Sequence, residues 1–346
     1  MPAVYPSSAN VFIRDHDASN KMVVDFARNV KDFTLNQYVQ VVPVKKTAGF
    51  FMHMTIEEAG RIQQADLRNF SWPDGQPAPE GAEGTESFEF KAFETKRFAY
   101  AFQLGDLTID QATWNILAQH ASIKSRQAMT ARTQLVITQA TTTANYDASH
   151  VIDVPALAGN SGKWSESTTG RQDIKRSLFT AAEKILDDTL AAINPEDLVL
   201  VISSGLAAEI AQCQEIVDYI KGSPEAYAQI RGELPNRNAF YGLPEKLYSF
   251  NLVVEATRKV TSKKGATTSR ASVLSKATPF LCSRPGGLVG VADAPNFSTH
   301  VLFAQEEMTV ETLRDAPNRR TTGRVVENII AKTVAPVSGV LFQNAA

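Results

Sequence analysis

The stretch SFEFKAFETKRFAYAFQLGD, residues 87–106, decides the fold because it reads as one unusually long β-strand. Every second residue from Phe88 to Leu104 is apolar, except for Glu94 and Lys96, which interrupt the row. Such alternation is typical of a strand with one buried face. At about 3.3 Å per residue this strand would run on the order of 55 Å, whereas most strands have about five or six residues. So long an aromatic strand needs a further surface to cover it.

The residues before this strand complete a hairpin. GFFMHMTIEE, residues 49–58, alternates in the same way and predicts the partner strand. Between the two lies NFSWPDGQPAPEGAEGTE, residues 69–86, which is acidic and too rich in Pro and Gly for a helix or a central strand. We therefore expect residues 55–104 to form a long two-stranded hairpin with a mobile tip. Isolated hairpins are marginal in water, so this one must lie on another surface.

After the hairpin the apolar period changes to that of a helix. Residues 108–140 contain no Gly or Pro, and Asp110 and Gln111 suit the first turn of a helix. About 30 residues at about 1.5 Å each predict a helix near 45 Å long. Its narrow apolar stripe favours a spine that lies along a sheet; a coiled coil is the alternative, but the heptads are not sustained. The stripe contains Ile109, Ala112, Ile116 and Ile123.

From residue 164 onward the pattern is that of an α/β domain. An apolar helical spacing predicts a helix that ends at Asn194-Pro195, and residues 198–202 form an apolar run typical of a strand covered on both faces. Ser203 or Ser204 can cap the helix that follows. The helical positions are Ile174, Leu178, Ala181, Ile185 and Ala192. Further strands are expected within residues 248–256, 279–283, 287–292, 299–304, 309–315 and 325–343.

Composition places the chain among soluble globular proteins. It has 346 residues, 43% of them hydrophobic, and a net charge of -2, which provides no global attraction to nucleic acid or membrane. Cys213 and Cys282 lie in apolar surroundings without metal-ligand spacing, so we expect both to be buried and reduced. No signal peptide and no membrane-spanning run is visible, which indicates a soluble protein of a reducing compartment.

No pattern in the sequence predicts a catalytic, cofactor-binding or metal-binding residue. VISSGLAA, residues 201–208, lacks the first glycine of a nucleophile elbow, and no phosphate-binding loop or dinucleotide fingerprint occurs. The histidines are scattered and form no metal-ligand pair. We therefore expect a protein that is not an enzyme. The five histidines are His16, His53, His120, His150 and His300.

Two basic segments stand out against the near-neutral charge. The first contains no acidic residue and predicts an exposed hairpin tip that contacts phosphate or an acidic partner, or is only solvated. Its cations are Arg258, Lys259, Lys263, Lys264, Arg270 and Lys276. The second surrounds the turn at residues 316–324 and could face the acidic loop 74–86, within one subunit or between subunits. Its arginines are Arg314, Arg319, Arg320 and Arg324.

The order of these elements resembles that of the major capsid proteins of tailed bacteriophages, the Hong Kong 97-type capsid fold. Residues 65–112, ADLRNFSWPDGQPAPEGAEGTESFEFKAFETKRFAYAFQLGDLTIDQA, resemble that family's E-loop leading into its spine helix. KWSESTTGRQDIKRSLFTAAEKI, residues 163–185, is similar to the start of its A-domain, with a Trp and an Asp-Ile before the first helix. The resemblance is one of pattern and order, and it covers nearly the whole chain.

The resemblance implies an α+β fold with an N-terminal arm, an E-loop hairpin, a P-domain with a long spine helix, and an α/β A-domain. The implied divisions are 1–48 for the arm, 49–105 for the P-domain strand and E-loop, 106–145 for the spine helix, 146–304 for the A-domain, and 305–346 for the P-domain return strands and C-terminal strand.

The resemblance also implies a function. The chain would assemble into pentamers and hexamers that form an icosahedral head shell around double-stranded DNA. Its partners would be other copies, a scaffolding protein, a portal protein and a decoration protein, with weak non-specific DNA contact and no membrane. It would lie in the virion after assembly and maturation of a procapsid in the host cytoplasm. An encapsulin-like bacterial nanocompartment and an α/β enzyme built on residues 160–300 are the alternatives.

In such a shell the E-loop lies over a neighbouring subunit. The contacts implied for the E-loop are Arg68, Trp72, Phe88, Phe90, Lys91, Phe93 and Lys96. Those implied for the P-domain are Arg314, Asn318, Arg319 and Arg320. Some members of the family join Lys and Asn across subunits, and Lys91 or Lys96 with Asn318 could supply these groups. No acid to promote that bond is evident in the sequence.

Overall fold

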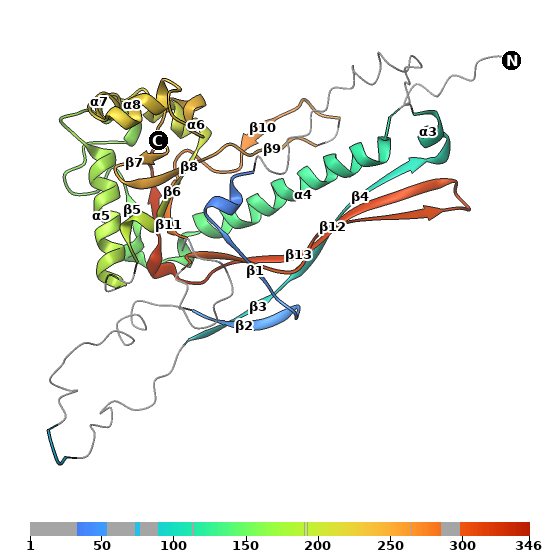
Figure 1. The fold of residues 1–346 in the computed structure, drawn as a ribbon, viewed down its shortest axis with the longest axis horizontal. Coiled ribbons are helices and arrows are strands. Elements are labelled where there is room, and N and C mark those ends of the chain that lie inside the picture. Colours follow the sequence, from blue (N-terminus) through green and yellow to red (C-terminus); the bar gives the residue numbers. More distant parts are fainter. Residues whose placement is uncertain are drawn as a thin grey trace.

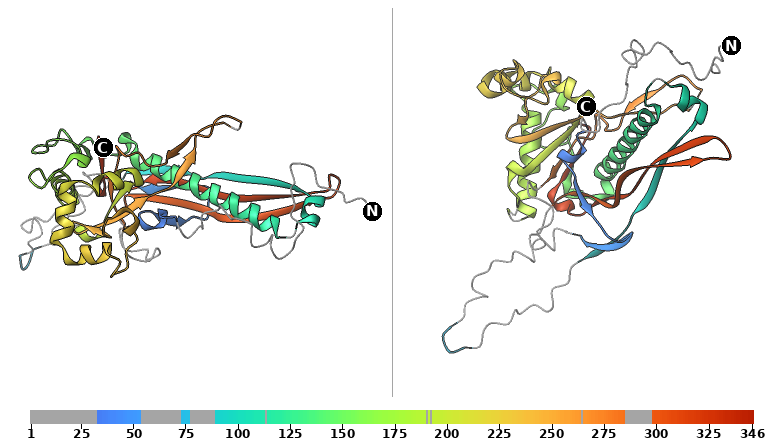
Figure 2. Two further views of the ribbon diagram at one scale, coloured as in Figure 1. Left: turned by 90° about the horizontal axis from the view of Figure 1, so that it is seen from above. Right: turned by 45° about the vertical axis from the view of Figure 1, so that its right-hand side comes forward.

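The computed structural model describes residues 33–53, 73–76, 89–284 except 113, 190, 192 and 264, and 298–346. Figure 1 shows a long sheet with helix α4 running beside it, joined at one end to an α/β part. Figure 2 shows that the far end of the long sheet extends well away from the α/β part. Several sequence predictions fall outside the described residues: most of the arm, residues 54–58 of the hairpin strand, Ala192, Lys264 and the strand at 287–292.

The long sheet has the order β1-β12-β13-β4, in which only β1 and β12 are parallel. Its strands are β1 (Gln40–Pro43), β12 (His300–Asp315), β13 (Arg320–Thr333) and β4 (Lys96–Gly105). The strands predicted at 299–304 and 309–315 are one strand, β12, whose register shifts twice between Ala304 and Thr309. Helix α4 (Ile116–Thr141) packs against β13 and β4, which confirms that it lies along a sheet.

A six-stranded sheet of order β5-β14-β11-β6-β8-β7 carries the α/β part. Its strands are β5 (Val151–Asp153), β14 (Val340–Gln343), β11 (Phe280–Ser283), β6 (Leu198–Ser203), β8 (Phe250–Glu255) and β7 (Lys246–Leu247). Its helices are α5 (Asp173–Asp188), α6 (Ser204–Ile210), α7 (Gln214–Gly222) and α8 (Pro224–Ile230).

Two separate ribbons complete the described strands. They are β2 (Ala48–Met52) with β3 (Phe90–Glu94), and β9 (Arg258–Val260) with β10 (Arg270–Ser272). The first confirms the base of the predicted hairpin, and the second confirms the basic hairpin. Short 3-10 turns lie at Leu35–Gln37, Thr143–Asn145, Ala148–His150, Trp164–Glu166, Pro195–Asp197, Ala239–Tyr241 and Pro336–Ser338.

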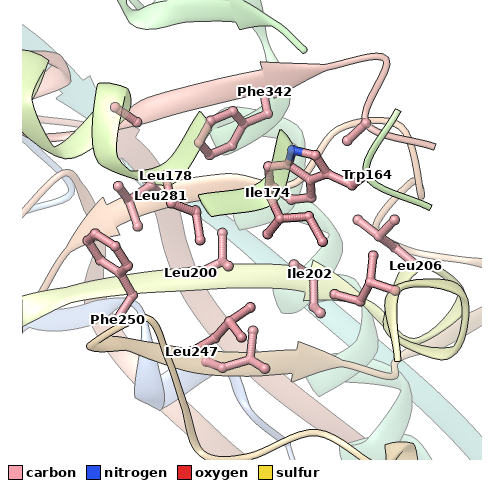
Figure 3. Close-up of a cluster of buried hydrophobic side chains, with 14 of the residues drawn as sticks. Trp164, Ile174, Leu178, Leu200, Ile202, Leu206, Leu247, Phe250, Leu281 and Phe342 are labelled. Atoms are coloured by element: carbon pink, nitrogen blue, oxygen red, sulfur yellow. The ribbon is translucent and has the colours of Figure 1, made fainter. Parts of the chain in front are cut away.

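Strand β6 is buried at every position, which confirms the prediction of a strand covered on both faces. Leu200 and Ile202 belong to a core shared with Trp164 and α5 to α7, and Figure 3 shows their side chains within it. Val199 and Val201 point the other way, into a second core formed with the end of α4 and the root of the long sheet. The six-stranded sheet therefore joins the two parts of the molecule.

The long strand predicted from residues 87–106 is divided at Thr95 into β3 and β4, which belong to different sheets. Thr95 is buried and donates its backbone N–H to the Thr47 carbonyl at 2.7 Å. The alternation changes phase at this break: Phe102 is buried as predicted, but in β3 Phe93 is buried and Phe90 is 61% exposed. The prediction of one continuous apolar row is therefore wrong in β3 and right in β4.

The predicted helix 108–140 is also divided. Residues 106–111 form a short helix, α3 (Asp106–Gln111), and Ala112 then adopts an extended conformation. Helix α4 begins only after Asn115, whose side chain accepts the Ala118 N–H at 3.0 Å. The first-turn role predicted for Asp110 and Gln111 is therefore wrong, because the capping side chain is further along the chain. No described helix is long and apolar enough to cross a membrane.

Residues 33–44, predicted as part of an extended arm, are built into the body. Leu35, Tyr38 and Val39 are buried in the second core, and β1 pairs with β12. The carboxylate of Glu255, fully buried at the end of β8, accepts hydrogen bonds from Thr34 at 2.7 Å and from the Tyr38 hydroxyl at 3.0 Å. The packed body thus begins well before residue 48.

Both cysteines are free and buried, as predicted. Burial raises the pKa of the Cys282 thiol to about 12 and also raises the pKa of Cys213. Neither thiol is therefore ionised near neutral pH.

Gly323 of β13 lies directly beneath the Phe102 ring, where an added Cβ would meet Phe102 Cζ at 2.2 Å. We expect Gly323→Ala to lower the free energy of unfolding by about 1–3 kcal/mol, because a well-packed site cannot take the methyl group. Gly170→Ala is the control, because its Cβ would meet no atom within 4 Å. Chemical denaturation measures the free energy of unfolding of both variants. Adding Phe102→Leu to Gly323→Ala should restore part of the lost stability. Equal stability of the two alanine variants would contradict this packing.

His300 is buried, with its ring nitrogens near the Tyr146 hydroxyl at 3.0 Å and the Thr333 hydroxyl at 3.2 Å. Burial lowers the pKa of His300 from 6.5 to about 3. Below pH 6.5 the His300 ring binds a proton in the unfolded chain but not in the folded chain. The contribution of the buried neutral ring to the free energy of unfolding is therefore fully present above pH 6.5 and is lost as the pH falls toward 3.

We expect the free energy of unfolding of the native chain to fall more steeply than that of His300→Gln between pH 6 and 4. The difference in slope should approach about 1.4 kcal/mol per pH unit. Denaturant titrations at several pH values measure it. His120→Gln is the control, because His120 is only partly buried; parallel curves for the native chain and His300→Gln would rule out the buried neutral imidazole.

Candidate assembly surface

The β2–β3 ribbon is attached to the body by one aromatic face. Phe93 stacks on Phe303 of β12 with ring centroids 4.4 Å apart, and Phe51 lies 5.7 Å from the same ring. Gly49 makes room for this packing, since a Cβ there would come within 2.9 Å of Phe93. The ribbon is therefore held in a defined orientation at its base.

The opposite face of the ribbon is apolar and uncovered. Phe50 is 76% exposed and Phe90 is 61% exposed. The register pairs Phe50 with Ala92 and Met52 with Phe90, so these four side chains share one face of the ribbon. Contiguous exposed apolar side chains that are held on a rigid element mark an interaction surface.

The residues predicted as E-loop contacts differ in where the structure places them. Arg68, Trp72 and Phe88 lie outside the described residues. Phe90 is available for an outside contact, but Phe93, predicted to reach another subunit, is used inside its own chain because the phase change at Thr95 turns it toward Phe303.

The two predicted lysine contacts are both solvent-exposed. Lys91 lies 3.6 Å from Glu89. Lys96 begins β4 opposite Ile329. Each amine is therefore accessible from outside the chain.

The tip of the β12–β13 hairpin brings together the predicted P-domain contacts. Three of its four arginines form ion pairs within the chain: Arg314 with Asp106 at 3.1 Å, Arg320 with Asp315 at 2.8 Å, and Arg324 with Glu311 at 2.5 Å. Arg319 is exposed in the turn, with a φ of 45°.

Asp315 is the centre of this tip. Asn318 donates to Asp315 Oδ2 at 2.8 Å, and the hydrogen bonds from Asn318 and Arg320 lower the pKa of the Asp315 carboxyl group. The sequence did not reveal this acid beside Asn318. Residues 73–76 lie at the opposite end of the molecule from this tip in both figures, so this part of the acidic loop does not meet the turn within one chain.

A buried ion pair fixes helix α4 to the long sheet. Arg132 Nη2 and Nε donate to the same Glu327 oxygen, Oε2, at 2.8 and 3.1 Å. Burial raises the pKa of Glu327 although Arg132 opposes the shift, and Glu327 Oε1 has no hydrogen-bond partner within the described residues. Phe102 of β4 stacks on His120 of α4 at 5.8 Å, which adds a second contact along the helix.

The polar side chains in the α/β part that the sequence did not reveal are structural. Glu215, almost fully buried, accepts the backbone N–H groups of Ile174 at 3.1 Å and Lys175 at 2.9 Å, and so caps the start of α5. It also accepts the Tyr248 hydroxyl at 2.8 Å. These partners are far apart in the sequence, so no local spacing could have indicated them.

An α/β enzyme would place convergent polar groups at the carboxyl ends of its parallel strands. Parallel strands β6 and β8 end at Ser203 and Glu255. Ser203 accepts the Leu206 N–H at 3.2 Å and caps α6, which confirms one of the two predicted caps. Glu255 is bound by Thr34, Tyr38 and the Thr257 N–H. These groups are thus committed to intrachain bonds, and the described residues contain no cluster of three potential metal ligands.

No protein-family model and no curated protein matches the sequence. Solved structures do match. A phage-related protein from Bordetella bronchiseptica RB50 has a TM-score of 0.62 at 15% identity, over 92% of this chain and 94% of that one. A chain of the cyanophage P-SCSP1u capsid has a TM-score of 0.55 at 12% identity, over 92% and 88%. A virus-like particle from Pyrococcus furiosus gives 0.50 at 10% identity, over 90% and 93%.

These likenesses confirm the predicted fold. The chain has the mixed α and β fold of phage major capsid proteins, the Hong Kong 97-type capsid fold. At 15% identity or less, the shared property is the fold.

The ion pair between α4 and β13 leads to a double-mutant prediction. We expect Arg132→Leu to lower the free energy of unfolding by about 3–5 kcal/mol, because it leaves the Glu327 carboxylate buried and unpaired. The double variant Arg132→Leu/Glu327→Leu should recover most of this loss, since apolar side chains can replace a buried pair. Chemical denaturation of the native chain, both single variants and the double variant completes the cycle. Additive losses would contradict the pairing.

Proposed function

We propose that this chain is a structural subunit that assembles into pentamers and hexamers and forms the icosahedral head shell of a tailed bacteriophage around double-stranded DNA. The observation that carries the proposal is the apolar outer face of the β2–β3 ribbon, with Phe50 and Phe90 exposed on a fold shared with phage capsid proteins. A protein with that face uncovered needs a second surface, and another copy supplies one.

The proposed contact of the β2–β3 ribbon joins two different surfaces of neighbouring subunits. In this proposal Phe90 contacts a neighbouring subunit, together with Arg68, Trp72 and Phe88. Lys91 and Lys96 are exposed near Phe90 and take part in the same contact. The neighbour is met by a different surface, so the contact is heterologous, and heterologous contacts that close produce rings. Many such contacts stabilise a shell together although each is weak.

The β12–β13 tip is a second contact in this proposal. It carries Arg314, Asn318, Arg319 and Arg320 on a hairpin that extends beyond the body, with Leu313 73% exposed. The ion pairs within the tip hold its shape while the strand edge and Leu313 remain available to other copies. The proposed divisions of the chain into arm, E-loop, P-domain and A-domain follow the same scheme.

The further partners and the setting follow from this role. A scaffolding protein, a portal protein and a decoration protein would act on the assembled shell or its precursor, and assembly would take place in the host cytoplasm before the virion is complete. The net charge of -2 suits a container that holds DNA without strong attachment. No catalytic activity is part of the proposal, since the polar strand ends are committed to structural bonds.

The likeness to a virus-like particle supports a closed shell but does not indicate what the shell holds, so an encapsulin-like bacterial nanocompartment is the alternative. Both would form closed shells, but the contents differ. Electron microscopy of the purified chain, with and without a co-expressed scaffold, should show closed shells with hexamers. Nuclease-protected DNA in particles from infected cells supports the head shell, and a protein cargo supports the alternative. A stable monomer under all assembly conditions would contradict both.

The outer face of the ribbon provides a specific test. We expect Phe50→Ser/Phe90→Ser to change the free energy of unfolding of the subunit by less than about 0.5 kcal/mol, since both side chains are exposed. Shell yield, measured by light scattering and electron microscopy, should fall at least tenfold because the apolar contact with the neighbour is lost.

Two controls accompany this variant. Leu234→Ser removes an exposed leucine elsewhere and should leave assembly unchanged. Phe93→Ser removes a buried anchor and should lower stability itself. Normal shells from the Phe50→Ser/Phe90→Ser variant would show that the ribbon face is not the contact.

A further inference from the structure

The β9–β10 hairpin carries positive charge that no described acidic residue neutralises by an ion pair. Residues 256–283 contain no Asp or Glu. Arg258, Lys263 and Arg270 are exposed, Lys259 is partly exposed, and none of the four has an ion pair among the described residues. The β12–β13 tip differs, because three of its four arginines are paired there. Of the two basic segments predicted from the sequence, this hairpin therefore has more cations without an ion pair among the described residues.

A hollow of about 610 Å³ opens at the root of the same hairpin. Ala208 of α6, Ala211 just after this helix, and Arg258 line the hollow. Phe240 and Tyr241 form an aromatic wall, with ring centroids 5.1 Å apart and edge to face. Phe240 is 91% exposed, so no described part of the chain covers its ring. An aromatic wall beside a cation suits a segment that contains both proline and carboxylate groups.

The chain itself contains such a segment. Residues 73–86, PDGQPAPEGAEGTE, hold three prolines and four acidic residues and no Lys or Arg. Prolines bind aromatic-lined grooves at low entropic cost, and the acids complement the hairpin. In Figures 1 and 2, residues 73–76 lie far from the β9–β10 hairpin of their own chain, so the partner considered for the hairpin is a second copy of the chain.

We propose that the β9–β10 hairpin, with the hollow at its root, binds residues 73–86 of a second copy of the chain. The prolines pack on Phe240 and Tyr241, and the acids face Arg258, Lys259, Lys263 and Arg270. This inference deepens and rests on the proposed self-assembly, because it names the surface that receives the E-loop tip. The contact is electrostatic and exposed, so it weakens as ionic strength rises.

A charge-swap experiment tests the contact in the full chain. The hairpin variant Lys259→Glu/Lys263→Glu/Arg270→Glu and the loop variant Glu80→Lys/Glu83→Lys/Glu86→Lys should each lower shell yield at least tenfold at low salt. A chain that carries both sets should recover most of the yield, because opposite charges meet again. The control Lys163→Glu/Lys221→Glu/Lys246→Glu makes the same net charge change at exposed positions elsewhere and should assemble normally.

A disulfide experiment tests the same contact without requiring closed shells. Both native cysteines are buried, so Glu83→Cys chains mixed with Lys263→Cys chains should form a cross-linked heterodimer on mild oxidation. Glu83→Cys mixed with Ala316→Cys, at the β12–β13 tip, should form far less. Equal or greater cross-linking to Ala316→Cys would overturn the proposal in favour of the other basic turn.

The remaining outcomes show whether a different partner binds the β9–β10 hairpin. If the hairpin variant fails to assemble and the loop variant assembles normally, the hairpin binds an acidic segment of a different protein, and the proposal is wrong. If both variants assemble but the hairpin variant retains less DNA, the hairpin contacts phosphate, which also overturns it. Either result leaves the shell function standing. If the native chain forms no shells at all, the proposed function fails, and the disulfide result alone then decides the contact.

Discussion

The structure depends on one constraint: the central strand β6 is apolar on both faces and must be covered from both sides. Leu200 and Ile202 are buried under α5 to α7, and Val199 and Val201 are buried under the end of α4 and the root of the long sheet. A sheet with only one covered face would leave a row of valines in water, at a cost of about 25 cal/mol for each Å² of apolar surface. This requirement joins the α/β part and the long sheet into one body.

The long sheet then extends beyond the core that anchors it. Near the root β12 is buried, but from Glu307 onward most of its residues are exposed. Strand pairing with β13 and two ion pairs hold this exposed part. The β2–β3 ribbon is similar, since one face rests on Phe303 and the other faces outward. The chain thus has partly apolar projections that its own core does not cover. Under the proposed function, other copies of the chain cover these projections, and repeated contacts of this kind build a shell.

Local patterns predicted the elements better than their boundaries. The buried β6 follows from its apolar run, and Ser203 was identifiable as a cap from its place at the end of that run. Helix α4 was predicted from a long segment without Gly or Pro, but its buried residues lie between Ala128 and Ala140 and not in the predicted stripe. The breaks at Thr95 and at Ala112 were not predicted, because no Gly or Pro marks either one. Thr95 is placed by a bond to Thr47, and α4 starts where the Asn115 side chain caps it. Of the predicted contact residues, Phe90 faces outward and Phe93 packs within its own chain, and the sequence did not indicate the acidic partners of the basic turn.

The sequence by itself determined which segments alternate, which are helical and which are acidic, basic or rich in proline, since these are properties of neighbouring residues. From their order it also indicated the Hong Kong 97-type fold, which the structure confirms. Only the tertiary structure decided which face of each strand is free and which charges are already paired. Phe303 lies 210 positions from Phe93 in the chain, and Asp106 lies 208 positions from Arg314. Contacts across such separations depend on how the sheets pack, and no local pattern contains that information.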